Sequence, residues 1–432
     1  MKPLSRSEVY MTTSAFSPWQ DEAAARIMER LERLARHSDD PQSLTRLYLS
    51  PAYREALTCL SGWMREAGLE VRRDEACNLI GRREGAQPGL PTLLLGSHLD
   101  SVRNAGKYDG PLGIIAAIEA VARLGSTSLP FAIEIAAWGD EEGVRFPTCL
   151  TGARAFAGTF DTGVLAFTDE EGISMRQALE ACGGAPDHIE AAAQNPVDYL
   201  AYLELHIEQG PVLESEALAL GVVTAIAGAE RHMIEVSGMA GHAGTVPMAL
   251  RHDALAAAAE MVLAAERIGQ ETPELVATIG QMSVLPGAVN VIPAHARFSL
   301  DLRSPSDAVR MQASARLFAA WQEIAHRRGV TITSQRTYEA AATLCAEGLI
   351  KLFDDALARA GLPLRHLPSG AGHDGLAIAT LCPIGMLFVR CRGGISHNPA
   401  EAITEEDAGV AVSVLADVIR HFSPTTLLST AS

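Results

Sequence analysis

The sequence has few cysteines, and none of them forms the close pairs that bind zinc or build redox sites. Its seven cysteines are scattered singly between Cys59 and Cys391, without a C-x-x-C pair. An odd number of isolated cysteines predicts reduced residues that mostly pack in the interior of a cytoplasmic protein. Thiolate ligands are therefore not expected in any metal site that the chain builds.

Long apolar runs and an excess of positive charge are also missing. No run of about 18 uninterrupted apolar residues is present to span a bilayer. The opening segment MKPLSRSEVYMTTSAF lacks the apolar core of a signal peptide. The formal net charge of −17 argues against nucleic acid or an anionic membrane surface as a partner. These absences predict a cytoplasmic globular protein.

The 432 residues exceed what one hydrophobic core usually supports, so two domains are expected. Thr92–Leu95 is apolar on both faces, Phe131–Trp138 is the next strand-like run, and the helical stripe Gly113–Leu124 lies between them. Strand, helix and strand in this order predict two parallel strands joined by a crossover. The predicted fold class is α/β, with a mostly parallel mixed sheet flanked by helices.

A smaller α+β domain is predicted to interrupt this α/β domain. Ala296–Arg303 alternates between apolar and polar residues, as in a half-buried antiparallel strand, and a long amphipathic helix follows at Ser306–Arg328. We therefore assign residues 1–220 and 337–432 to a discontinuous catalytic domain and residues 221–336 to the insertion.

Histidine and carboxylate residues follow several of the apolar runs. A lone histidine at a strand end is more often a hydrogen-bonded core residue than a ligand, but several such clusters favour a metal site. Two metals bridged by one carboxylate need imidazole and carboxylate ligands, plus a spare carboxylate acting on water. The candidates are His98, Asp109, Glu141, Glu142, His206 and His397.

Eight segments give the chain a specific resemblance. They are GSHLDSV, KYDGPLG, DEEGVRF, LELHIEQGPVLE, AGHAGTVPM, PGAVNVIP, SGAGHDG and GGISHNPAE, in order between Leu93 and Glu401. This pattern resembles the hydantoinase/carbamoylase family of amidohydrolases, within the superfamily of dinuclear zinc aminoacylases and carboxypeptidases.

The resemblance implies two divalent metal ions in each subunit. Asp109 would bridge them, His98 and His206 would complete one site, and Glu142 and His397 the other. Nitrogen and oxygen ligands admit zinc, which we expect first, and also manganese, cobalt or nickel.

Two further carboxylates receive roles from the same resemblance. Glu141 would be the general base, taking a proton from the attacking water and passing it to the leaving nitrogen. The carboxylate of Asp100 would hold the far nitrogen of His98 and fix its tautomer.

The implied substrate contacts come largely from the inserted domain, which in the family serves as a lid and dimerises. His242 would stabilise the oxyanion, Gln209 would contact the ureido group, and Gly372 would approach a carboxylate. Asn290 and Arg303 would grip that carboxylate, because the planar guanidinium binds both oxygens. For Arg303 the alternative is an internal ion pair with Asp301. A homodimer with active-site residues shared across its interface is implied.

The predicted activity is metal-dependent hydrolysis of a linear ureido C–N bond in a small anionic substrate. Allantoate is the leading candidate substrate, because the tail MLFVRCRGGISHNPAE resembles proteobacterial sequences to which allantoate is usually assigned as substrate. N-carbamoyl-L-amino acids are the alternative, since the same contacts serve both. A ureidoglycolate hydrolase and a non-catalytic ligand-binding relative are further alternatives.

Overall fold

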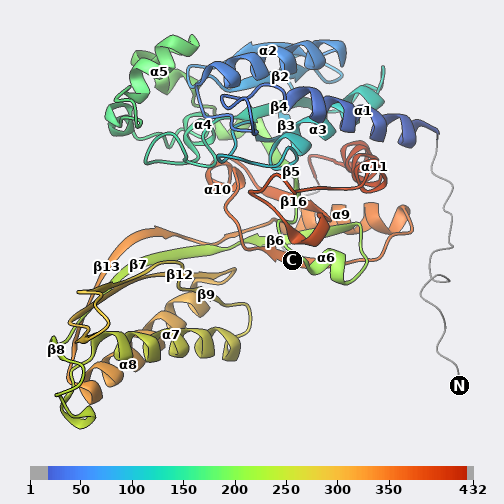
Figure 1. Cartoon of the computed structure of the whole chain (residues 1–432). Coiled ribbons are helices and arrows are strands. Elements are labelled where there is room, and N and C mark those ends of the chain that lie inside the picture. The colour runs from blue at the N-terminus through green and yellow to red at the C-terminus, as the bar shows by residue number, and fades with distance from the viewer. Residues whose placement is uncertain (1–17, 426–432) are drawn as a thin grey trace, which may run out of the picture. The chain divides into compact units, whose positions relative to one another are not determined.

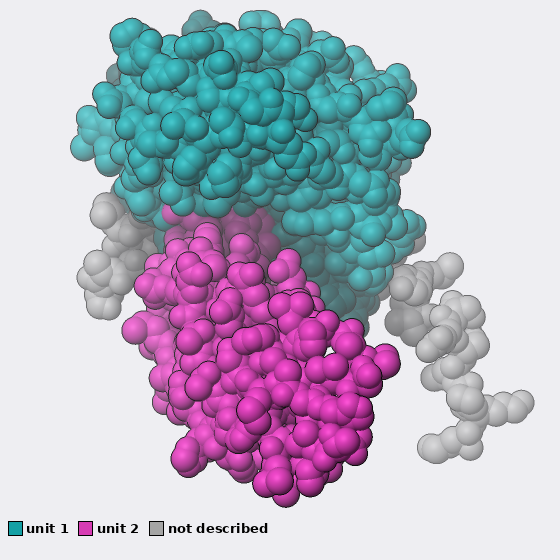
Figure 2. All heavy atoms as spheres, turned by 60° about the vertical axis from the view of Figure 1, so that its left-hand side comes forward, with its two compact units in different colours: residues 1–222, 346–365, 377–432 teal, residues 223–345, 366–376 magenta. Residues whose placement is uncertain are grey.

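The computed structural model describes residues 18–425, which form two compact units (Figure 2). Unit 1 comprises residues 18–222, 346–365 and 377–425, and unit 2 comprises residues 223–345 and 366–376. The sequence analysis placed the insertion at 221–336. Unit 2 continues to 345 and takes in a second, short segment, which carries little periodic pattern of its own.

A mixed sheet with a parallel centre forms the middle of unit 1 (Figure 1). Strands β4, β3, β5 and β16 run parallel to one another, whereas β2 pairs antiparallel with β4 and β1 extends this antiparallel edge. All residues of β3, β4 and β16 are buried, as expected for strands apolar on both faces. The order is β1 (Glu70–Arg73), β2 (Leu79–Arg83), β4 (Ala132–Trp138), β3 (Thr92–His98), β5 (Tyr199–Ile207), β16 (Ile384–Val389) and β6 (Leu220–Ile226), which continues into unit 2.

Helices pack against this sheet and against one another. α3 (Pro111–Arg123) contacts α1 (Pro18–Leu34), α11 (Glu405–His421) and strands β3 to β5, while α11 also contacts α9 (Glu347–Arg359). α2 (Pro51–Glu66) packs on β1 and β2. Within residues 18–425, no helix combines the length and apolar character needed to cross a membrane.

Unit 2 is a five-stranded antiparallel sheet packed on two long helices (Figure 1). β12 (His295–Ser304) pairs with β7 (Gly228–Ser237), β9 (Val276–Thr278) and β10 (Met282–Leu285), and β13 (Thr331–Ala340) pairs with β7. The predicted alternation along β12 is present, because its alternate apolar side chains are fully buried against α7 (Ala254–Glu271) and α8 (Asp307–Arg328). The α/β class with a smaller α+β unit is confirmed.

The remaining elements are short. They are α4 (Thr151–Phe156), α5 (Met175–Cys182), α6 (Val212–Ser215), α10 (Gly375–Ile378), β8 (Gly241–His242), β11 (Val291–Ile292), β14 (Thr343–Leu344), β15 (His366–Ser369), and the 3-10 turns Thr162–Ala166, Pro186–Ala192, Pro196–Asp198, Met248–Leu250 and Arg392–Gly394.

Candidate active site

The carboxyl ends of four neighbouring parallel strands carry the candidate metal ligands of unit 1. His98 ends β3, His206 lies near the end of β5, and Glu142 and His397 follow β4 and β16. Asp109 precedes α3, and the next residue must be glycine, because Gly110 has a φ of +80° and a Cβ there would overlap His98. The parallel arrangement therefore brings together residues that are far apart in sequence.

The first cluster consists of two imidazoles and one carboxylate oxygen, all buried. Asp109 Oδ1 lies 3.1 Å from His206 Nε2 and 3.4 Å from His98 Nε2. The two Nε2 atoms are 3.4 Å apart. Each Nδ1 lies 2.9 Å from a backbone carbonyl, of Asp100 and of Ile207 respectively. A carbonyl can only accept, so each Nδ1 carries the proton and each Nε2 of a neutral ring presents a lone pair.

Two ring nitrogens and one carboxylate oxygen thus point their lone pairs at one another. Such an arrangement is stable in the protein interior only when a cation lies between these atoms. Within residues 18–425, Asp109 Oδ1 is buried and makes no hydrogen bond of acceptable geometry. The unsatisfied oxygen of Asp109 fits a divalent metal ion, and so does a set of ligand atoms that contains only nitrogen and oxygen.

The second cluster uses the other oxygen of the same carboxylate. Asp109 Oδ2 lies 3.2 Å from His397 Nε2, which is 3.5 Å from Glu142 Oε2. Burial and the charge of Asp109 raise the pKa of Glu142 to about 7. Contact with Asp109 raises the pKa of His397 to about 8. Asp109 thus presents one oxygen to each cluster, as a bridging carboxylate would.

The loop after β4 is held by Asp100, in a way the sequence analysis did not foresee. The Asp100 carboxylate accepts the backbone N–H groups of Glu141 and Glu142, at 3.1 and 3.2 Å. It is the backbone carbonyl of Asp100, not its carboxylate, that holds His98 Nδ1. The carboxylate instead fixes the backbone that carries both glutamates, of which Glu141 is partly exposed.

Gln209 lies beside the shared carboxylate. Its Nε2 donates to Asp109 Oδ2 at 2.9 Å, and its backbone is left-handed with a φ of +56°. Its Oε1 is buried and makes no hydrogen bond within the described residues. An acceptor at this position suits the N–H groups of a ureido group.

Two polar residues of this network were missed by the sequence analysis. Ser396 Oγ lies 2.7 Å from Asp109 Oδ2, and Glu401 accepts the backbone N–H of Asp109 at 3.0 Å. Both occur in the segment GGISHNPAE, but nothing in that segment separates them from ordinary loop residues.

The other predicted substrate residues lie in unit 2, in two groups. The Asn290 carbonyl accepts the N–H of Ala243, 2.9 Å away, which places Asn290 beside His242 in the β8–β11 ribbon. Arg303 belongs to the second group, with Gly372 two residues beyond its contact Gly370. Along β12 the groups are separated by the residues from His295 to Arg303, a span of about 26 Å. β8 contains His242, and β9 pairs with Arg303. Figure 1 shows β8 and β9 at opposite ends of the sheet of unit 2.

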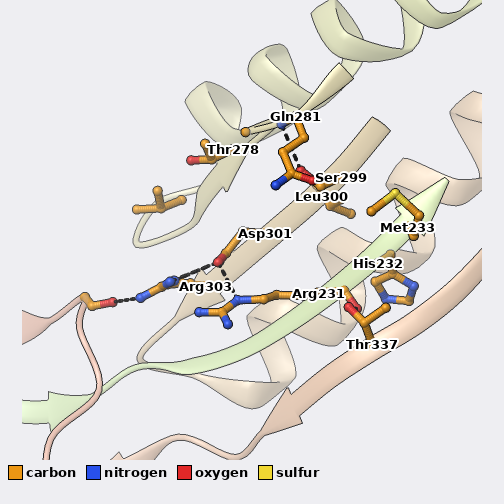
Figure 3. A pocket seen from close by; sticks show the side chains of 13 residues that line it. Arg231, His232, Met233, Thr278, Gln281, Ser299, Leu300, Asp301, Arg303 and Thr337 are labelled. Atoms are coloured by element: carbon orange, nitrogen blue, oxygen red, sulfur yellow. Dashed lines mark hydrogen bonds and ion pairs between the residues drawn. The ribbon is translucent and has the colours of Figure 1, made fainter. Parts of the chain in front are cut away.

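Arg303 is already paired within unit 2 (Figure 3). Its Nε and Nη2 donate to Asp301 at 2.7 and 2.9 Å, and its Nη1 donates to the Gly370 carbonyl at 2.9 Å. The ion pair considered as the alternative is therefore present. Arg231 donates to the same carboxylate at 2.9 Å, and the residues surround a cavity of about 650 Å³.

Comparison with known proteins identifies the class of protein. Residues 94–421 match the model of "Peptidase family M20/M25/M40", so the chain belongs to this family of metal-dependent hydrolases. The chain is 43% identical to the N-carbamoyl-L-amino acid amidohydrolase of Geobacillus stearothermophilus, over 90% of this chain and 96% of that protein. It is 38% identical to an allantoate deiminase of Arabidopsis thaliana, covering 91% and 80% of the two chains.

Solved structures narrow the class further. The crystal structure of a hydantoinase/carbamoylase family amidase from Burkholderia multivorans has a TM-score of 0.87 and 33% identity, covering 92% of this chain and 97% of that one. The predicted resemblance to hydantoinase/carbamoylase amidohydrolases is confirmed, and the chain is a hydrolase of that family.

Proposed function

We propose that this protein hydrolyses the terminal C–N bond of a linear ureido acid, with allantoate as the leading substrate. The observation that carries the proposal is the shared carboxylate of Asp109, which faces two imidazole lone pairs through Oδ1 and the His397–Glu142 pair through Oδ2. One carboxylate between two donor sets is the arrangement needed for a pair of divalent ions.

Each group would hold one ion, with His98 and His206 on one side of Asp109 and Glu142 and His397 on the other. The bound ions supply positive charge, which acidifies water and polarises the ureido carbonyl. Zinc is our first expectation for both positions, and manganese, cobalt and nickel suit the same donors.

Glu141 is proposed to move the proton. It adjoins Glu142 on the backbone that Asp100 holds, so one carboxylate coordinates while its neighbour carries out the acid–base work. Glu141 takes a proton from the attacking water and delivers it to the leaving nitrogen. Cleavage of the carbamoyl group yields ammonia, carbon dioxide and the parent amine.

The separation within unit 2 supports an active site shared between two subunits. A small ureido acid is much shorter than the roughly 26 Å between the two groups, so one substrate cannot touch both groups of the same chain. We propose a homodimer in which Arg303 and Gly372 act on one side of each substrate. His242 and Asn290 would come from the other chain, and unit 2 would serve as lid and dimerisation domain.

Two substrates deserve direct comparison. Allantoate is favoured by the tail segment around His397, and N-carbamoyl-L-amino acids by the 43% identity to an amidohydrolase named for them. The test is ammonia release from allantoate and several N-carbamoyl-L-amino acids after defined loading with zinc or manganese. We expect allantoate to have the highest kcat/KM. Two bound metals without turnover on any ureido acid would instead leave a non-catalytic binding protein.

A further inference from the structure

The loop that carries His397 is tied to the loop that carries Asp109 by a buried carboxylate. Glu401 is 3% exposed, and its Oε1 accepts the backbone N–H groups of Tyr108 and Asp109 at 2.8 and 3.0 Å. Its Oε2 lies 3.1 Å from Ser396 Oγ. Glu401 therefore bonds to the backbone of the shared ligand, and its Oε2 shares the single hydroxyl proton of Ser396, the neighbour of His397, with Asp109 Oδ2.

Ser396 extends this connection to the ligand atoms. Its hydroxyl lies 2.7 Å from Asp109 Oδ2, the oxygen that faces His397 at 3.2 Å. The contacts from Glu401 through Ser396 thus end at the side chain of Asp109. Glu401 also accepts the backbone N–H of the same residue. A carboxylate fixed both at its backbone and at one oxygen has little freedom to rotate.

A glycine makes room for this arrangement. A Cβ at Gly106 would overlap the side chain of Glu401, so only glycine lets that carboxylate approach the backbone of residues 108 and 109. This close approach is independent of the hydrogen bonds and locates Glu401 at the same place.

We propose that Glu401, acting through Ser396 and the backbone of Asp109, is a positioning residue that sets the angle of the shared carboxylate. Its effect falls on the second cluster, of Asp109, Glu142 and His397, because Ser396 holds the oxygen that faces His397. This role rests on the proposed function, in which the two clusters bind divalent metal ions.

The test is metal titration of the metal-free full-length protein with manganese or zinc, followed by calorimetry and by emission analysis of the bound metal. Loss of supports around ligands typically lowers metal affinity by about 10–100-fold. We expect Glu401→Ala to weaken one of the two metals, that of the second cluster, by that factor, and Ser396→Ala to weaken it by about 10-fold while the protein stays folded. Gly106→Ala should reproduce the loss by displacing Glu401.

Glu401→Gln is the rescue variant. Its amide oxygen can accept both backbone N–H groups, and its NH2 can donate to Ser396 Oγ, so the same connections remain. We expect its metal affinity within about 3-fold of wild type. If Glu401 acted only through its negative charge, Glu401→Gln would lose metal affinity as Glu401→Ala does.

Glu230→Ala is the control for removing a buried carboxylate. Glu230 is 5% exposed and accepts a hydrogen bond from Arg310 Nη1 at 2.9 Å in unit 2, which contains none of the proposed metal ligands. We expect this variant to lower the melting temperature without changing metal affinity. Wild-type affinity for both metals in Ser396→Ala and Glu401→Ala would overturn the positioning proposal. Failure of the wild-type protein to bind any metal would overturn the proposed function itself.

Discussion

Unit 1 and unit 2 bring their candidate functional residues together in opposite ways. In unit 1, parallel strands end at one edge, so ligands from His98 to His397 meet around a single carboxylate. In unit 2, an antiparallel strand separates His242 and Asn290 from Arg303 along its length. The difference teaches that one chain brings the proposed metal ligands together by itself, whereas its two groups of proposed substrate residues stay apart.

Removing the shared carboxylate should have the largest effect, because unit 1 depends on one residue for both clusters. We expect Asp109→Ala to lose both metals and to reduce kcat/KM by at least about 10⁴-fold, the scale on which whole catalytic units fail. His98→Ala should chiefly weaken one metal. Metal analysis after dialysis distinguishes the two variants, and retention of one tightly bound metal in Asp109→Ala would argue against a bridge.

Glu141→Gln should separate metal binding from proton transfer in unit 1. We expect both metals to remain while kcat falls by about 10²–10⁴-fold, the usual contribution of a general base. Metal content and steady-state ammonia release give the two readouts. A fully active variant would show that the base is another residue.

Mixing two inactive variants tests the arrangement proposed for unit 2. His242→Ala and Arg303→Ala should each be nearly inactive as homodimers, and a mixed dimer should regain one intact site. The mixed dimer isolated through both tags therefore has one intact site of two and up to about half of wild-type activity. The measurement is ammonia release after co-expression and purification through two different tags. Absence of any recovery in a verified mixed dimer would place both residues in the site of their own chain.

Metal affinity should depend on pH through the second cluster. Contact with Asp109 raises the pKa of His397 to about 8, and burial raises the pKa of Glu142 to about 7. Metal must displace these protons, so affinity should fall about 10-fold per pH unit below pH 8 and more steeply below pH 7. Calorimetry in buffers of different ionisation enthalpy counts the released protons, and a flat profile from pH 6 to 9 would contradict this assignment.

The smallest effect is expected on the helical face of unit 2. Arg328 and Arg327 lower the pKa of Glu260 to about 2, so the ion pair stabilises above the ordinary pKa of about 4.5 and is lost as the pH falls from there towards 2. The groups are partly exposed, and Glu260→Gln should cost less than about 1 kcal/mol near neutral pH. Urea unfolding at pH 7 and pH 3 measures this. A much larger loss at pH 7 would place this face in a buried contact.

The sequence predicted elements that position the clusters, because the apolar runs Thr92–Leu95 and Phe131–Trp138 identify β3 and β4. Convergence of the ligands could be expected from the rule that parallel strands share an edge. The contacts of Ser396 and Glu401 could not, since they arise where two loops distant in sequence close on each other. The use of a backbone carbonyl rather than the Asp100 carboxylate on His98 leaves no trace in residue types.

The pairing of Arg303 with Asp301 has a consequence for which small molecules can occupy unit 2. A carboxylate attached two residues away is present at an effective concentration of at least millimolar order. A simple organic acid below that concentration therefore competes poorly with Asp301 for the guanidinium. A molecule that also binds at a second position raises its own local concentration. Such a molecule competes better for the guanidinium of Arg303. The internal ion pair thus disfavours the binding of simple organic anions at Arg303 without a steric barrier.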